Sequence, residues 1–222
     1  MARRRKPVIS ARKNPQQTRS AQLVAAILEA AIRVLVRDGA YHFTTARVAE
    51  AAGVSVGSLY QYFPNKEAIL FRLQAQEWRQ TMDQLDRILS DQSMPAPQRI
   101  RAAVRTFFRS ECDEAAFRSA LEEAAPLYRE APEAGAHAEE GRDLMERFIK
   151  DALPRASARE RAFAADLVGI VMSSTGKAIS IQNRSRSEVD ALADAVGDMF
   201  CAYLETRGDH GRTATQAVRK AK

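Results

Sequence analysis

The sequence predicts an all-α fold of about nine helices, in which a small three-helix domain precedes a larger helical bundle. Three observations indicate this class: alanine is abundant, apolar residues recur at intervals of three and four, and no stretch alternates apolar with polar residues as a strand does. The 222 residues are 45% hydrophobic and 28% charged, which is typical of a chain that folds around a core and excludes the disordered class.

The small domain is predicted from helices near the N-terminus. The first begins near residue 18 and ends at a glycine stop at residue 39. Two short helices follow, at about 45–52 and 56–63, separated by Gly53 and ended by a Pro-Asn pair. A long helix over about 66–89 then connects the small domain to the bundle.

The bundle is predicted from five further helices, which prolines and the polar linker NRSRS separate. These helices are expected over 96–110, 113–129, 132–152, 158–182 and 187–205. The chain then divides into a basic disordered arm (1–17), the small domain (18–65), the bundle (66–206) and a basic disordered tail (207–222).

Basic residues are concentrated at the two ends of the chain. Residues 1–19 carry seven Lys or Arg and no acid, whereas residues 207–222 carry five basic groups and one acid. Since the ends contribute +7 and +4 to a formal net charge of +6, residues 20–206 carry −5. Basic ends favour a polyanionic partner, through counterion release, or are simply solvated.

Membrane, disulfide and catalytic signals are not found in the sequence. No apolar run approaches the roughly 20 residues of a membrane span, and the basic start leads into polar sequence, so we expect a cytoplasmic protein that does not associate with membranes. Cys112 and Cys201 lie far apart without CxxC spacing, so reduced thiols are expected. A helical bundle can house catalysis, but phosphate loops, nucleophile elbows and HExxH spacing are missing. We therefore expect no enzyme, no cofactor and no bound metal.

The segment TTARVAEAAGVSVGSLYQYFPNKEAIL, residues 44–70, has the spacing of a helix-turn-helix. Gly53 permits the sharp turn because glycine accepts a positive φ. Ala49 is small where the second helix crosses closely above the first. The small internal core is expected from Val48, Ala52, Val54 and Leu59.

The polar residues of this segment suit contact with DNA. Thr44 and Thr45 can cap the first helix and, with its free N–H groups, form a seat for phosphate, while Ser55 can cap the second helix. Tyr62 and Lys66 follow where they can touch phosphates on the flank. The second helix displays small and hydrogen-bonding groups toward the base edges of a major groove: Val56, Gly57, Ser58, Tyr60 and Gln61.

Over residues 28–70 the chain resembles the DNA-binding domain of the TetR family of tetracycline-repressor-like regulators. The specific matches are TT before the first short helix, VAEAAGVS at the turn, GSLYQYF along the second helix and NKEAIL after it. The resemblance implies that Thr45, Tyr62 and Lys66 hold phosphates and that Arg47 faces the groove with the residues of the second helix. Any one of these side chains has the alternative of a cap, a packing contact or a surface charge.

The resemblance also implies a function: a ligand-responsive transcriptional regulator, most simply a repressor that a small apolar or amphipathic effector releases from a palindromic operator in double-stranded DNA. Activation instead of repression stays open, because the position of the operator decides whether binding activates or represses transcription. The arginines of residues 3–5 either enter a minor groove or are solvated. The basic tails also fit a nonspecific architectural DNA-binding protein, against which the acidic body argues.

A homodimer is expected because one helix-turn-helix offers little contact, and the last two helices have apolar stripes wide enough to pair two protomers. The alternative is that these stripes only complete the core of one chain. The candidate dimerisation residues are Phe163, Leu167, Ile170, Ser174, Val189, Leu192, Val196, Met199, Phe200 and Tyr203.

By resemblance, the effector cavity lies among the large apolar residues between positions 66 and 182. Each of these residues is equally suited to a plain core position. The candidate ligand-binding residues are Trp78, Phe107, Phe108, Phe117, Tyr128, Met145, Phe148 and Met172.

Overall fold

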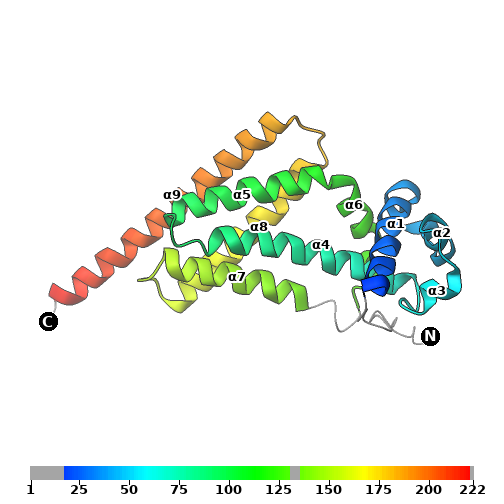
Figure 1. Cartoon of the computed structure of the whole chain (residues 1–222). Helices are drawn as coiled ribbons and strands as arrows, with labels where there is room; N and C mark the ends of the chain where they lie inside the picture. The colour runs from blue at the N-terminus through cyan, green and yellow to red at the C-terminus, as the bar shows by residue number, and fades with distance from the viewer. Residues whose placement is uncertain (1–17, 131–135, 221–222) are drawn as a thin grey trace, which may run out of the picture. The chain divides into compact units, whose positions relative to one another are not determined.

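The computed structural model describes residues 18–130 and 136–220. Over these residues the chain forms nine α-helices and one short 3₁₀ helix, with no β-strand, which confirms the predicted all-α class (Figure 1). The predicted basic arm, residues 1–17, lies outside the described residues.

Packing divides the chain into two compact units. The first comprises Met1–Arg79 and Glu114–His137, and the second comprises Gln80–Asp113 and Ala138–Lys222. Helix α4 (Lys66–Leu89) is continuous through the boundary between them. A segment from the middle of the chain therefore belongs to the same unit as the N-terminal helices.

The first unit contains α1 (Thr18–His42), α2 (Thr45–Ala51), α3 (Val56–Tyr60) and α6 (Ala115–Ala124), together with the start of α4. Helix α6 packs against α1. Apolar side chains from all five helices are buried in one cluster, whose most enclosed members include Ile27, Leu35, Phe43, Val48, Leu59, Phe63, Ile69 and Leu121.

Helix α1 is interrupted at the predicted glycine stop. Gly39 has φ 73° and ψ 170°, a backbone conformation that glycine adopts without the steric penalty of a side chain. The chain then resumes helical geometry as far as His42, so the break lies at the predicted residue and the element ends slightly later.

The middle of the chain differs from the single helix predicted over 113–129. Helix α5 (Ala96–Asp113) ends, α6 follows, and a 3₁₀ helix η1 (Ala125–Leu127) takes the place of a further α-helical turn. Pro126 explains the change, because proline has no N–H to donate to the carbonyl four residues earlier.

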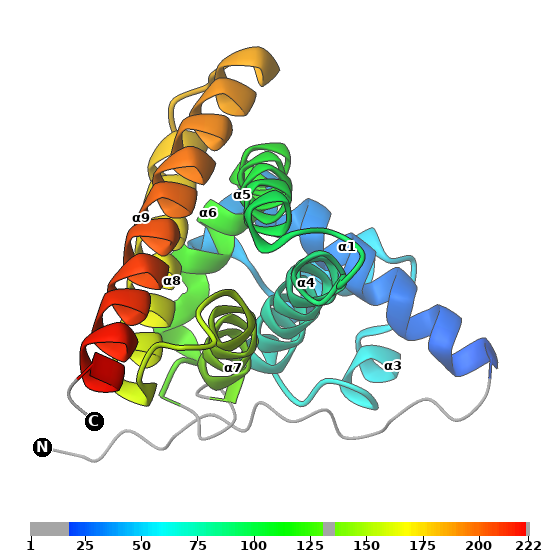
Figure 2. The same cartoon turned by 90° about the vertical axis from the view of Figure 1, so that its left-hand side faces the viewer.

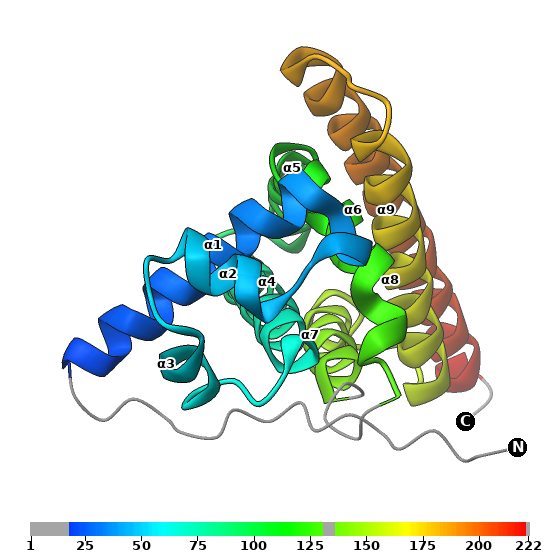
Figure 3. The same ribbon diagram turned by 90° about the vertical axis from the view of Figure 1, so that its right-hand side faces the viewer.

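The second unit contains α5, most of α7 (Ala136–Ala152), α8 (Ala158–Ser180) and α9 (Arg186–Lys220), together with the end of α4. Helices α8 and α9 run antiparallel, and α5 packs against both (Figures 2 and 3). Gly197 lets α9 approach α5 closely, since a Cβ atom there would lie 2.9 Å from Arg101 Cγ. The core of this unit includes Phe107, Phe108, Met145, Phe148, Val168, Met172, Val189, Val196 and Phe200.

Ion pairs between α5 and α9 recur at every fourth residue of both helices. Arg109 donates from Nε and Nη2 to the two carboxylate oxygens of Asp190, each at 2.7 Å. This hydrogen bonding lowers the pKa of the Asp190 carboxyl. The three pairs, which we term the Arg–Asp ladder, are Arg101 with Asp198, Arg105 with Asp194 and Arg109 with Asp190.

Helix α9 is longer than the sequence predicted. The sequence predicts an end near residue 205, whereas the helix continues to Lys220. Residues 186–220 contain no proline, and Gly208 and Gly211, which weaken a helix, lie within α9 without ending it.

Helix α8 is long and apolar enough, by length and composition alone, to cross a membrane, which differs from the expectation that the chain has no such run. The core helix of a soluble protein meets the same criterion. Several residues along α8, among them Ala164, Val168 and Met172, are buried in the core of the second unit.

Candidate functional site

Hydroxyl groups cap both helices of the predicted helix-turn-helix. Thr44 is extended (φ −135°, ψ 151°) and its side chain accepts a hydrogen bond from the backbone N–H of Arg47 at 3.3 Å. Ser55 is also extended, and its Oγ accepts from the backbone N–H of Ser58 at 3.0 Å. The caps predicted at Thr44 and Ser55 are confirmed, and they fix where α2 and α3 begin.

The turn between α2 and α3 has the predicted geometry. Gly53 has φ 66°, in the left-handed region that favours glycine, and the next N–H, of Val54, donates to the carbonyl of Ala49 at 3.0 Å. Val48 and Leu59 are completely buried, one from each helix. These contacts hold α2 and α3 as one rigid corner.

The outer face of α3 is exposed and carries small or polar groups. Val56 is 40% exposed and Tyr60 39% exposed, while Gly57 and Gln61 are exposed and Ser58 is half-buried. A Cβ atom added at Gly57 would meet only Ser55 Oγ, at an ordinary 3.8 Å. Nothing inside the chain therefore requires glycine at this position.

A side-chain hydrogen bond joins the start of α2 to the end of α3. The hydroxyls of Thr45 and Tyr60 lie 3.1 Å apart. Tyr62 differs from Tyr60, because its side chain is only 7% exposed and belongs to the core of the first unit. Lys66, the first residue of α4, is half-buried. Of the three residues implied to hold phosphates, Thr45 and Lys66 are thus more accessible than Tyr62.

Asp38 is a residue of this site that the sequence analysis missed. Its carboxylate accepts hydrogen bonds from Arg37 at 2.7 and 2.8 Å and from Arg47 Nη1 at 3.3 Å. The hydrogen bonds from Arg37 are the main reason that the pKa of Asp38 is lowered. Arg47 Nη1 also donates to the carbonyl of His42 at 3.4 Å. The guanidinium of Arg47 is therefore held against the end of α1.

The eight candidate ligand-binding residues fall into two groups. Five of them lie together in the core of the second unit, where each is at most 9% exposed: Phe107, Phe108, Met145, Phe148 and Met172. Trp78, Phe117 and Tyr128 belong to the first unit. The structure thus brings five of the candidates into one apolar cluster.

Two of the three first-unit candidates carry polar atoms in apolar surroundings. The Tyr128 hydroxyl donates to the carbonyl of Leu121 or to Gln74 Oε1, each at 3.3 Å, and burial raises the pKa of Tyr128 to about 12. Trp78 Nε1 is buried and has no hydrogen-bond partner among the described residues. Tyr128 therefore has a structural role in this unit, and Trp78 retains an unused donor.

The candidate dimerisation residues divide between two faces of α8 and α9. Phe163, Ile170 and Met199 are 59%, 64% and 63% exposed, and Ser174 is exposed too. Leu167, Leu192 and Tyr203 are half-buried, whereas the remaining candidates pack inside their own chain: Val189, Val196 and Phe200. The exposed set, with Ile181 at 74%, is what we term the outer face of α8 and α9.

The two cysteines are free thiols, as predicted. Burial raises the pKa of both Cys112 and Cys201, so each stays protonated. Among the residues that the structure describes, no group of three or more His, Cys, Asp or Glu is placed to hold a metal ion.

Two family models match the chain. Residues 27–73 match bacterial regulatory proteins of the tetR family, and residues 95–206 match the tetracyclin repressor-like C-terminal domain. Together these matches include the capped helix pair, all of α5 and α8, and the larger part of α9.

Known proteins resemble the chain in fold and, over a short stretch, in sequence. The fatty acid metabolism regulator protein of Bacillus subtilis is 30% identical over 67 residues, which are 30% of this chain and about a third (34%) of that relative. A TetR-family regulator structure from Mesorhizobium loti has a TM-score of 0.68 at 19% identity, covering 84% of this chain and 98% of that one. The regulator FadR from Bacillus subtilis, in complex with stearoyl-CoA, has a TM-score of 0.63 at 16% identity, covering 79% and 96%.

Proposed function

We propose that this chain, which belongs to the TetR family of bacterial regulatory proteins, is a homodimeric repressor that a small apolar or amphipathic effector releases from a palindromic operator. The chain is a transcriptional regulator with a DNA-binding helix-turn-helix. The single observation that supports the proposal best is the exposed, small and polar face of α3, held by the Ser55 cap and the Gly53 turn.

The α3 face is suited to a major groove. A short helix with half-buried Ser58 and exposed Tyr60 and Gln61 can offer hydrogen bonds to base edges, and the bare backbone at Gly57 permits close approach. At the start of α2, the hydroxyls of Thr44 and Thr45 lie beside free N–H groups, which favours a phosphate. Arg47, Tyr62 and Lys66 complete the proposed contacts, with Ser55 and Val56 at the start of α3.

Self-association would supply the second half of the DNA contact. The outer face of α8 and α9 exposes large apolar side chains, whose burial against a second copy would be favourable by about 25 cal/mol per Å². Gly169 lies on α8 with open space where a Cβ atom would be, so another helix can cross there closely. A two-fold arrangement of two helix-turn-helix motifs reads two half-sites of a palindrome.

The apolar cluster of the second unit is the proposed effector site. It joins Phe107, Phe108, Met145, Phe148 and Met172, which suits a long apolar body such as an acyl chain. The Bacillus subtilis FadR structure contains stearoyl-CoA, and we extend the same ligand class to this chain. An effector releases DNA only if it binds the two conformations of the protein unequally.

Selection of duplexes from a random pool tests the DNA-binding proposal. The full chain, stripped of small molecules that co-purify, is expected to enrich one sequence with two-fold symmetry. Stearoyl-CoA added to the complex is expected to release that duplex, whereas free CoA, which lacks the acyl chain, is not. A pool that remains random after selection would contradict the proposal. We place the protein in the cytoplasm, where its DNA lies.

A further inference from the structure

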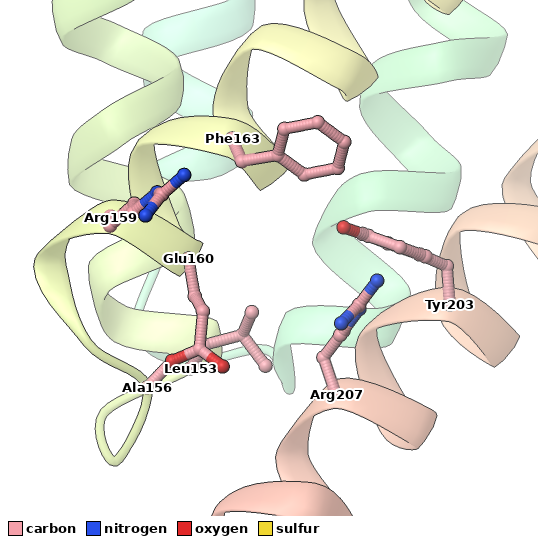
Figure 4. A pocket seen from close by; sticks show the side chains of 7 residues that line it. All are labelled: Leu153, Ala156, Arg159, Glu160, Phe163, Tyr203 and Arg207. Atoms are coloured by element: carbon pink, nitrogen blue, oxygen red, sulfur yellow. The ribbon is translucent and has the colours of Figure 1, made fainter.

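A hollow of about 170 Å³ lies on the second unit, apart from the proposed effector cluster. Its wall is formed by the turn before α8, the first turns of α8 and a distant part of α9 (Figure 4). The lining residues are Leu153, Ala156, Arg159, Glu160, Phe163, Tyr203 and Arg207. None of the eight candidate effector residues is among them.

Two guanidinium groups border the hollow from different helices. Arg159 belongs to α8 and Arg207 to α9, and both are exposed. Among the side chains that the structure describes, neither makes a hydrogen bond or an ion pair. The guanidinium carbon of Arg207 lies over the ring of Tyr203, 5.4 Å from the ring centroid. This contact steadies the guanidinium while its N–H edge stays available.

The one carboxylate in the wall is already engaged. Glu160 Oε2 accepts from the backbone N–H of Ser157 at 2.8 Å and from its hydroxyl at 2.7 Å, which completes the capping box of α8. In Figure 4 the carboxylate points away from Phe163 and Tyr203. The carboxylate of Glu160 thus stabilises the start of α8, and the two arginines give the hollow a positive charge.

The rest of the wall is apolar. Phe163 presents a ring that is 59% exposed, Tyr203 a half-buried ring on the facing helix, and Leu153 a buried floor. A cavity of about 150 Å³ is large enough to admit a benzene-sized molecule. Guanidinium groups bind carboxylates through parallel hydrogen bonds, so the hollow combines a ring-sized apolar space with cationic ends.

We propose that this hollow binds a small aromatic carboxylate, with its ring between Phe163 and Tyr203 and its carboxylate held by Arg159 and Arg207. The site does not depend on DNA contact or on the effector cluster. It does share Phe163 with the outer face of α8 and α9, so benzoate binding requires that a second copy of the chain leave this end of the face open.

The test uses benzoate as the probe and the neutral isostere benzamide as its control. Saturation-transfer NMR with the full chain is expected to give an affinity for benzoate at least about tenfold higher than for benzamide, since only benzoate pairs with guanidinium. Arg159→Gln and Arg207→Gln are each expected to weaken benzoate binding about tenfold. Arg155→Gln, an exposed arginine nearby that does not line the hollow, is the matched control and keeps the wild-type affinity.

Three results would overturn the proposal. They are absence of benzoate binding, equal binding of benzoate and benzamide, and unchanged affinity in the Arg159→Gln/Arg207→Gln double variant. If a second copy of the chain fills the hollow instead, benzoate does not bind and the mass of the double variant in solution differs from that of the wild type. The melting temperature of each variant checks that it folds, which both exposed positions permit.

Discussion

At Gly57 the fold does not require glycine, so a role of this residue in binding can be tested separately from its role in the fold. Its helix gains nothing from glycine, because φ is not in the left-handed region and the space for a Cβ atom is free. Glycine weakens a helix by about 1 kcal/mol relative to alanine at interior positions, and by less at Gly57, which is the second residue of α3. The cost is explained if the backbone at Gly57 must approach a partner closely.

The variant Gly57→Ala is expected to fold at least as stably as the wild type and to bind the selected operator at least about tenfold more weakly, a loss of about 1.4 kcal/mol. Thermal unfolding and fluorescence anisotropy with labelled duplex measure the two effects. The comparison variant is Gly53→Ala, where φ of 66° makes alanine strained, so stability falls. Unchanged operator affinity in Gly57→Ala would argue against α3 in the groove.

Asp38 places a negative charge beside a residue proposed to contact DNA. It pairs with both Arg37 and Arg47, so its carboxylate offsets charge that a phosphate would otherwise meet. The variant Asp38→Asn frees these arginines. We expect higher affinity for an unrelated duplex and a plot of log K against log salt concentration steeper by about one.

The control for Asp38→Asn is Asp83→Asn, which changes the net charge equally but removes an exposed carboxylate of the second unit. Its salt dependence is expected to match the wild type. If both variants steepen the plot by the same amount, net charge rather than Arg47 is responsible.

At the level of the helices, the Arg–Asp ladder fixes how α5 and α9 pair. Its members are partly exposed, so each pair is screened by salt and contributes modestly. We expect Arg109→Gln to lower the melting temperature at low salt and less so at high salt. Arg87→Gln, an exposed arginine on α4 outside the ladder, is the control and leaves the melting temperature unchanged.

The ion pair of Arg109 and Asp190 predicts that the stability of the fold depends on pH. Arg109 lowers the pKa of Asp190 in the folded chain, so the pair contributes stability above the pKa of an unfolded Asp, about 4. That contribution is lost as pH falls through the lowered pKa. The stability difference between wild type and Arg109→Gln is therefore full at neutral pH and vanishes in acid; a difference that persists in acid would contradict this account.

Local features were predictable from the sequence, and long-range ones were not. The caps at Thr44 and Ser55 and the turn at Gly53 depend on neighbouring residues only, and all three are confirmed. The apolar stripe of α9 was too wide to show which of its residues face the core of their own chain. Val196 is buried in that core, whereas Met199 faces outward. The Arg–Asp ladder had a signal, Arg and Asp at every fourth position, but choosing the partner helix requires the fold.

For the molecule as a whole, the outer face of α8 and α9 is an apolar surface that the single chain leaves uncovered. The substitutions Ile170→Glu and Met199→Glu place charge on this face without disturbing the core, because both side chains are more than 60% exposed. We expect each to shift the mass in solution from two chains to one, since a charge buried at an interface is unfavourable. Light scattering measures this.

The control is Val36→Glu, which adds the same charge at an exposed apolar residue of the first unit, 44% exposed. It is expected to remain dimeric. A wild-type protein that is a single chain in solution would contradict the proposed dimer. It would also contradict the proposal that two helix-turn-helix motifs read a palindrome.

Binding to one and to both halves of the selected operator tests the central claim most directly, namely that two copies of the Gly53-hinged helix pair read one duplex. The account predicts two chains per duplex and an affinity for the full site at least about a hundredfold higher than for a duplex with a single half. One chain per duplex, with equal affinity for the full site and the half-site, would contradict it.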